Sequence, residues 1–185
     1  MHFTDRRVHM YLLKIQNTPN ETITQIEFEK ISHDCVMISV IYDTSDNFGV
    51  PSYWRLVGSK PNPPLEIGIN TDKSTIKHLT IFVDASCFNE INLEGLYTQN
   101  GNIIVDTDIF KKKNDYVDAE GKYFITLSTN KLSCVFGAQD HIKNAIGNDR
   151  IKFLINNNNE LCGFELYNLN ENEIESIQFI RHSGQ

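Results

Sequence analysis

The sequence lacks any long hydrophobic run, and this absence limits the classes of protein to which it can belong. No stretch of the 185-residue chain approaches the roughly 20 apolar residues that a membrane-spanning helix needs. The early apolar stretch is interrupted at Lys14, and no small-residue cleavage site follows it. We therefore expect neither a signal peptide nor a membrane span.

Cysteine is scarce, and its spacing is not that of a disulfide framework or a zinc site. The four cysteines are widely separated and form no Cys-x-x-Cys pair; they are Cys35, Cys87, Cys134 and Cys162. Each has apolar neighbours, which is typical of a small buried side chain in a reducing compartment. We expect free core thiols, in preference to disulfides or zinc ligands, in a cytoplasmic protein with no cofactor.

Short β-strand signals dominate what the chain does contain. The 40% hydrophobic and 22% charged residues are typical of an ordinary folded protein. About eleven segments are rich in β-branched and aromatic residues and end at Asn, Asp, Gly, Ser or Pro. They predict a mainly β protein with an antiparallel β-sandwich-like architecture, organised as a single domain over residues 1–185.

Helical periodicity is weak and predicts only a few short helices. One candidate is AQDHIKNAI, residues 138–146. The other is residues 171–180, where Asn170 can cap the helix, Glu173 stands three residues later and isoleucines share one face.

Two stretches share one pattern, LEIGINTDKSTIKHLTIFV at residues 65–83 and RIKFLINNNNELCGFELYNL at residues 150–169. Each has an alternating apolar run, a polar loop, and then apolar residues at offsets of three and two. Asparagine is a typical turn residue, so we expect hairpin turns at 70–75 and 156–160. The pattern predicts two pseudo-repeated halves, although any two antiparallel hairpins could align this well. The predicted halves span about 35–97 and 122–180.

No catalytic motif stands out, and one pair of carboxylates is the best candidate for chemistry. Asp106 and Asp108 stand two apart, so on a strand both would face the same way, as a magnesium site requires. The alternative is two solvated surface carboxylates, because the spacing indicates no third ligand. His33 and Cys35 would share one strand face and form a weaker candidate for a nucleophile pair.

The segment NFGVPSYWR gathers aromatic residues around the only tryptophan, Trp54. Tyrosine, tryptophan and arginine are common in binding hot spots and on sugar-binding platforms. The alternative, which we favour, is that Trp54 fills the core. Tyr53 or Arg55 then lies on the opposite, exposed face of the strand.

Charge is unevenly distributed over the chain, whose net charge is −7. Residues 84–110 and 156–178 contain acidic side chains and no lysine or arginine. Such a field repels nucleic acid and attracts a basic partner. The alternative is that the acids only keep the protein soluble.

These observations favour a cytoplasmic, acidic protein-binding module whose partner is a basic protein, with neither nucleic acid nor a membrane as partner. Small bacterial immunity proteins, which neutralise a basic toxin by occlusion, have this general character. The alternatives are a carbohydrate-binding or lectin-like module, and a small metal-dependent enzyme that uses Asp106 and Asp108. The expected partner contacts are Glu90, Glu94, Asp106, Asp108, Glu171, Glu173, Glu175, Tyr53 and Tyr97. Charge reversal at the three helix glutamates should slow association and leave the melting temperature nearly unchanged.

A thiol reagent added to the native protein should label the cysteines slowly, because buried thiols react poorly, and all four should react after denaturation. Mass spectrometry of the labelled protein measures the number of modified thiols. Rapid labelling of all four in the native state, or any native disulfide, would contradict the expectation.

Overall fold

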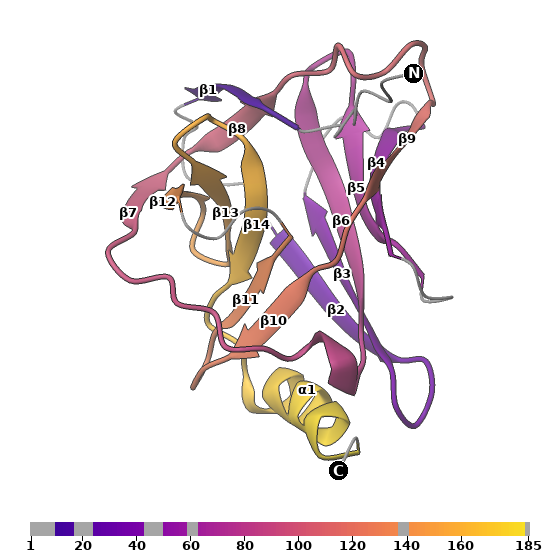
Figure 1. Ribbon diagram of the computed structural model, residues 1–185, viewed down its shortest axis with the longest axis vertical. Helices are drawn as coiled ribbons and strands as arrows, with labels where there is room; N and C mark the ends of the chain where they lie inside the picture. Colours follow the sequence, from indigo (N-terminus) through magenta and orange to yellow (C-terminus); the bar gives the residue numbers. More distant parts are fainter. Residues whose placement is uncertain (1–9, 17–23, 43–49, 59–62, 137–140, 184–185) are drawn as a thin grey trace, which may run out of the picture.

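The computed structural model describes residues 10–16, 24–42, 50–58, 63–136 and 141–183. Over these residues the chain forms fourteen strands in two mixed sheets and one α-helix (Figure 1). The prediction of a mainly β fold is confirmed. The expectation of purely antiparallel sheets is corrected, because each sheet contains a parallel pair of strands. The sandwich-like arrangement of the sheets stays a prediction.

The first sheet is built from β1 (Leu12–Gln16), β2 (Thr24–Lys30), β3 (Val36–Tyr42), β4 (Ser52–Val57), β5 (Leu65–Asn70), β6 (Thr75–Val83), β8 (Asn102–Val105) and β9 (Tyr116–Glu120). Its main part has the order β9, β4, β5, β6, β3, β2, in which β9 is parallel to β4 and the other neighbours are antiparallel. β8 pairs with the first residue of β6 and with β1.

The second sheet is built from β7 (Tyr97–Asn100), β10 (Phe124–Leu127), β11 (Leu132–Val135), β12 (Ile142–Gly147), β13 (Ile151–Asn156) and β14 (Leu161–Leu166). Its order is β7, β12, β13, β14, β11, β10, with β7 parallel to β12 and the other neighbours antiparallel. This is the order and the direction of the main part of the first sheet. The two halves stay a prediction, and a duplicated unit that produced this shared order would comprise β2–β6 and β10–β14.

Equivalent β-bulges lie in the two hairpins with the repeated sequence pattern. In β5–β6 the register shifts after Gly68, which leaves Lys77 of β6 as the extra residue. In β13–β14 it shifts after Leu154, which leaves Cys162 as the extra residue. A bulge inserts one residue and keeps the next apolar side chain on the core face. It therefore explains the apolar offset of three in both sequences.

An asparagine at the end of the first strand anchors each of these hairpin turns. The Oδ1 atom of Asn70 accepts hydrogen bonds of 3.0 and 3.2 Å from two turn amides. The Oδ1 atom of Asn156 accepts bonds of 2.8 and 2.9 Å in the same way. Each turn contains a left-handed residue, Ser74 at φ 56° and Asn159 at φ 60°. Both predicted turns are confirmed, and asparagine serves them as a backbone hydrogen-bond acceptor.

One of the two predicted helices is confirmed. Helix α1 (Glu171–Ser183) begins after Asn170, whose Oδ1 accepts the Glu173 N–H at 3.0 Å, while Glu173 Oε2 accepts the Asn170 N–H at 2.8 Å. This reciprocal pair is a capping box. The other predicted helix, 138–146, is wrong, because residues 142–147 form β12 between β13 and β7. Residues 138–140 lie outside the described residues.

One hydrophobic cluster contains side chains of both sheets and of α1. Ile38 and Leu79 of the first sheet, Phe164 of the second and Ile177 of the helix are all fully buried in it. Trp54 belongs to the same cluster and is only 4% exposed, so its interpretation as a core residue is confirmed.

The cysteines behave as the sequence predicted. All four are free, three of them are buried and Cys35 is partly buried. Burial raises the pKa of the Cys87 thiol to about 11 and that of Cys162 to about 11, so both stay protonated at neutral pH. No helix among the described residues is long and apolar enough to cross a membrane.

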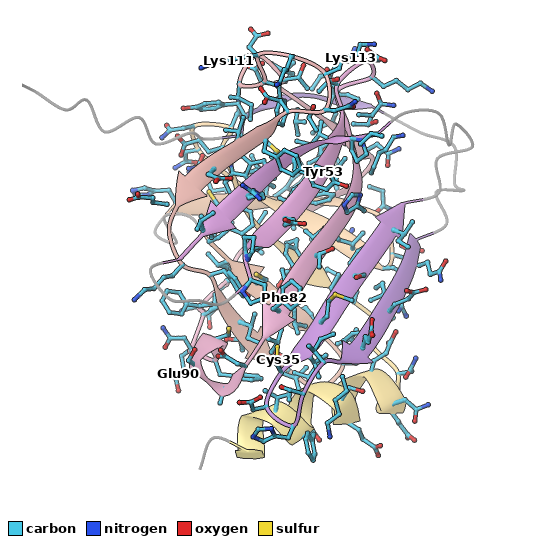
Figure 2. All side chains as sticks on the ribbon, turned by 90° about the vertical axis from the view of Figure 1, so that its right-hand side faces the viewer. Cys35, Tyr53, Phe82, Glu90, Lys111 and Lys113 are labelled. Carbon is cyan, nitrogen blue, oxygen red and sulfur yellow. The ribbon has the colours of Figure 1, made fainter. Side chains whose placement is uncertain are left out.

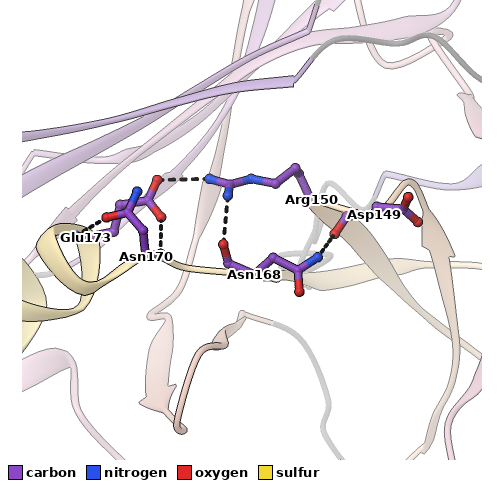
Figure 3. Close-up of polar contacts among 5 residues, drawn as sticks. All are labelled: Asp149, Arg150, Asn168, Asn170 and Glu173. Atoms are coloured by element: carbon purple, nitrogen blue, oxygen red, sulfur yellow. Dashed lines mark hydrogen bonds and ion pairs between the residues drawn. The ribbon is translucent and has the colours of Figure 1, made fainter.

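Glu173 joins α1 to the turn between β12 and β13 (Figure 3). Arg150 in that turn donates to Glu173 Oε1 at 2.9 Å and to the carbonyl oxygen of Asn168 at 2.8 Å. The Asn168 side chain in turn donates to the carbonyl oxygen of Asp149 at 3.0 Å. Since its other oxygen accepts the Asn170 N–H, Glu173 uses both carboxylate oxygens inside the fold.

Glu173→Ala should lower the free energy of unfolding by about 1–3 kcal/mol, because it removes the capping box and leaves Arg150 without its carboxylate partner. Denaturant unfolding at neutral pH measures the change. Glu175→Ala is the matched control on the exposed side of the same helix, and it should change stability by less than about 0.5 kcal/mol. Equal effects would contradict this role. We therefore expect charge reversal to leave the free energy of unfolding nearly unchanged at Glu171 and Glu175, but to lower it at Glu173.

Candidate functional site

The acidic residues nominated from the sequence are spread over several parts of the fold. Glu90 and Glu94 lie between the 3-10 helix η1 (Ala85–Cys87) and β7, and Asp106 and Asp108 follow β8. The helix α1 contains Glu171, Glu173 and Glu175. Figure 1 shows α1 at the bottom of the molecule and the connection from β8 to β9 at its top. The fold does not bring these acids to one site. Tyr97 is exposed on the edge strand β7, and Tyr53 lies on β4.

Asp106 and Asp108 do not share a strand. β8 ends at Val105, and Asp106 Oδ1 accepts the backbone N–H of Asp108 at 2.9 Å in a turn. The prediction that both carboxylates face the same way along a strand is therefore wrong. In the part of the chain that the structure describes, no group of three or more His, Cys, Asp or Glu side chains could hold a metal ion. The two carboxylates thus lack the shared strand face on which the predicted magnesium site depended.

The chain itself covers the outer face of the second sheet, which is the face that points away from the shared core. Figure 1 shows the segment from η1 to β7, residues 88–96, crossing this sheet. Its apolar side chains pack on a separate hydrophobic cluster of the sheet. The covering residues are Ile91, Leu93 and Leu96, and the covered ones are Val135, Ala145 and Leu154. Every residue of the adjoining strand β14 is also buried.

The outer face of the first sheet, here called the open face, presents its side chains to solvent (Figure 2). Cross-strand pairing arranges them in rows that run across the strands. The tyrosine row consists of Gln25, Ile41, His78, Gly68, Tyr53 and Tyr116. The charged row consists of Glu27, Ser39, Thr80, Glu66, Arg55 and Asp118. Next to it lie Glu29, Met37, Phe82, Val57 and Glu120.

The tyrosine row is a strip of contacting rings. The Tyr53 and Tyr116 rings stack with centroids 5.2 Å apart, and Tyr53 meets His78 edge-on at 5.2 Å. A Cβ atom at Gly68 would stand 2.3 Å from His78 Cε1, so glycine makes room for the imidazole at this position. Tyr116 is 56% exposed and Ile41 is 44% exposed. The row thus combines ordered aromatic side chains with accessible apolar surface.

The charged row contains one tightly held ion pair. Arg55 donates to both oxygens of Asp118, at 2.7 and 2.9 Å, and its guanidinium lies 4.8 Å from the centroid of the Tyr116 ring. The hydrogen bonds to Asp118 are the main reason that the pKa of Arg55 is raised. Glu66 lies opposite Arg55 on β5. The other carboxylates of the open face, Glu27, Glu29 and Glu120, make the face acidic.

A small cleft of about 190 Å³ lies beside the tyrosine row and has Pro51, Lys77 and Lys113 among its lining residues. Lys113 pairs with Asp72 at 2.8 Å across the cleft. Burial lowers the pKa of His78, and the charge of Lys77 lowers it further, so the imidazole is neutral near pH 7. The tyrosine row is therefore a neutral strip beside carboxylates near pH 7.

The weaker nucleophile candidate gains no support from its surroundings. The His33 side chain is 87% exposed and lies 3.8 Å from Asp34. Burial raises the pKa of the Cys35 thiol, and the nearby Asp84 and Asp34 raise it further. A reactive thiolate needs the opposite, electropositive setting.

The sequence pattern points to Tyr53 and Arg55 but not to the other members of the open face. The missed signal is period-two alternation in QIEFEK and YVDAE, where polar or aromatic residues occupy every second position. Alternation identifies the outward side chains but not their neighbours. Only the strand order brings Asp118 to Arg55, 63 residues earlier in the chain.

No protein-family model matches the chain, and a search of curated proteins finds no match.

Protein stability should decrease in mild acid because of His78. Burial against Tyr53 and Gly68, together with Lys77, holds its pKa below the ordinary value of roughly 6.5. The unfolded chain binds this proton more readily, so the contribution to stability is complete above about pH 6.5 and is lost as pH falls through the lowered pKa. Denaturant unfolding between about pH 7.5 and about pH 5 should show a smaller loss for His78→Gln than for the unchanged protein.

His33→Gln is the control for this measurement, because His33 is exposed. It should follow the pH profile of the unchanged protein. Identical profiles for His78→Gln and the unchanged protein would show that His78 does not cause the loss.

Proposed function

We propose that the protein is a cytoplasmic, acidic protein-binding module that binds a basic partner protein through the open face of its first sheet. The observation that carries the proposal is the contrast between the two outer faces. The chain buries one of them under residues 88–96 and presents the other with exposed Ile41 and Tyr116. Contiguous aromatic and apolar side chains on a surface are typical of a protein contact.

Charge indicates the kind of partner. Carboxylates accompany the tyrosine row along the charged row, and the whole chain has a net charge of −7. Opposite potentials raise association rates and fix orientation, whereas a charged rim alone contributes little affinity. The tyrosine row supplies the apolar contact that the carboxylates lack. Four free thiols accord with a reducing compartment.

Occlusion of a basic toxin is the finer form of this proposal. A toxin active site that binds nucleic acid is itself basic, and an acidic face with an apolar strip is complementary to such a surface. A bacterial immunity protein works in this way when it covers the active site of its toxin.

A carbohydrate-binding module is the second candidate, and one observation favours it. Tyr116 exposes 56% of its surface beside Arg55 and Asp118, and sugars commonly stack on such rings. Glycan binding by the purified protein that is lost in Tyr116→Ala would support this candidate instead.

The test is co-purification of the tagged protein from its native host. The open-face variant combines Glu27→Lys, Glu29→Lys and Tyr116→Ala, three changes at exposed positions. The control variant combines Glu171→Lys and Glu175→Lys, exposed positions on α1 that were also nominated from the sequence.

A basic protein should bind the unchanged protein and the α1 variant, and at least about tenfold less of it should bind the open-face variant. Binding should also weaken as salt concentration rises. Loss in the α1 variant with retention in the open-face variant would contradict the open face as the contact surface.

A further inference from the structure

The shared strand order allows each position on one outer face to be matched with a position on the other. Aligning the two bulges places Gly68 at the position of Leu154, and strand pairing then fixes the rest. The matched pairs on the same row are Ile41 with Val135, His78 with Gly163, Tyr53 with Ala145, and Tyr116 with Thr98.

The match shows that the tyrosine row is the counterpart of the patch that residues 88–96 cover. Val135 is 1% exposed and Ala145 is 0% exposed, whereas Ile41, the counterpart of Val135, is 44% exposed. The chain thus provides an occupant for one of two equivalent strips. Among the described residues it provides none for the other.

The way in which the second sheet is covered indicates the geometry of such an occupant. The covering segment is first held at the edge strand β10, where the Asn89 N–H donates to the carbonyl oxygen of Ile125 at 3.0 Å. It then crosses the sheet and packs Ile91, Leu93 and Leu96 on the apolar patch before it enters β7. The counterparts of β10 and β7 in the first sheet are β2 and β9.

Charge has opposite sign at one matched position of the two faces. The covering segment carries Glu90 and Glu94, and the face that it crosses presents Lys152. The counterpart of Lys152 on the open face is Glu66. Glu66 and the other carboxylates of the open face therefore favour a basic occupant.

We propose that the tyrosine row receives an extended segment of the basic partner, which crosses the open face between β2 and β9 as residues 88–96 cross the second sheet. The inference rests on the proposed function and adds the form and chemistry of the bound element. The segment has apolar side chains that contact Ile41 and Tyr53. It also has Lys or Arg side chains that lie against Glu66 and the other carboxylates.

Strand spacing gives the length of the bound segment. Ile41 on β3 and Tyr116 on β9 are separated by four strand-to-strand steps, through β6, β5 and β4. Four steps of about 4.8 Å span roughly 19 Å, which corresponds to about six residues of extended chain.

Site-specific photo-cross-linking tests the proposal. A photoreactive amino acid replaces Ile41 or Tyr116 in the full chain, and the protein is irradiated in its native host. The same replacement at Tyr97, which is 66% exposed on the second sheet, is the control. Cross-linked peptides are then sequenced.

The expected result is that the Ile41 and Tyr116 positions link to one short stretch of one partner chain. The linked residues should be about six apart, in a stretch that contains Lys or Arg and alternating apolar residues. A synthetic peptide of that stretch should bind the purified protein at least about tenfold more weakly after Tyr116→Ala. The Tyr97 position should give no such link.

Three outcomes would overturn the inference, and they separate it from the proposed function. Links to distant parts of the partner sequence, or to a second copy of this chain, overturn the inference of an extended bound segment. The proposed function still stands in that case if the open-face variant no longer binds the partner. Links from the Tyr97 position alone overturn both. Absence of links from the Ile41 and Tyr116 positions, with the partner retained by the open-face variant, also overturns both.

Discussion

The supply of apolar covering segments is the constraint on which the rest of this structure depends. Each sheet places one face in the shared core, and its other face needs either a cover or side chains that tolerate water. Residues 88–96 cover the second sheet, where Val135, Ala145 and Leu154 are fully buried. No such cover lies over the first sheet among the described residues. β6 accordingly alternates between buried and partly exposed positions.

Local features of this fold could be predicted from the sequence, because they depend on neighbours in the chain. The Asn170–Glu173 capping box, the turns at Asn70 and Asn156, and the buried Trp54 are of this kind. Features that depend on distant strands could not. The segment around Ile142 has weak helical periodicity, yet it forms a strand because β13 and β7 lie on either side of it.

The candidate site was only partly predictable for the same physical reason. Tyr53 adjoins Trp54 in the sequence, and alternation places it on the outer face. Tyr116 and His78 lack such a local signal, since they become its neighbours only through pairing with β9 and through the β5–β6 hairpin. Asp106 and Asp108 illustrate the converse error. Their spacing of two predicts that both lie on a strand, but the strand β8 ends at Val105, before either of them.

The matched bulges show how one backbone arrangement accommodates two different faces. In the first sheet the pair beside the bulge is Gly68 with His78, and in the second it is Leu154 with Gly163. The glycine lies on β5 in the first pair and on β14 in the second, so each pair combines one large and one small side chain. A Cβ atom at Gly163 would stand 2.2 Å from the Cys134 carbonyl oxygen, which makes that glycine necessary. The exchange places an imidazole on the open face and a leucine under the covered one.

The edge strands also have a consequence for the order in which the chain can assemble. β7 is an edge strand of the second sheet, and β9, which follows it in the chain, is an edge strand of the first. The connection between β6 and β10 therefore supplies an edge strand to each sheet. During synthesis the first sheet stays incomplete until β9 has emerged, and β7 must wait for β12. Strand pairings this distant in sequence slow folding, because the entropy of loop closure is lost before the stabilising contacts form. A chain cut within that connection would leave both sheets unfinished, so the two sheets are expected to fold as one cooperative unit.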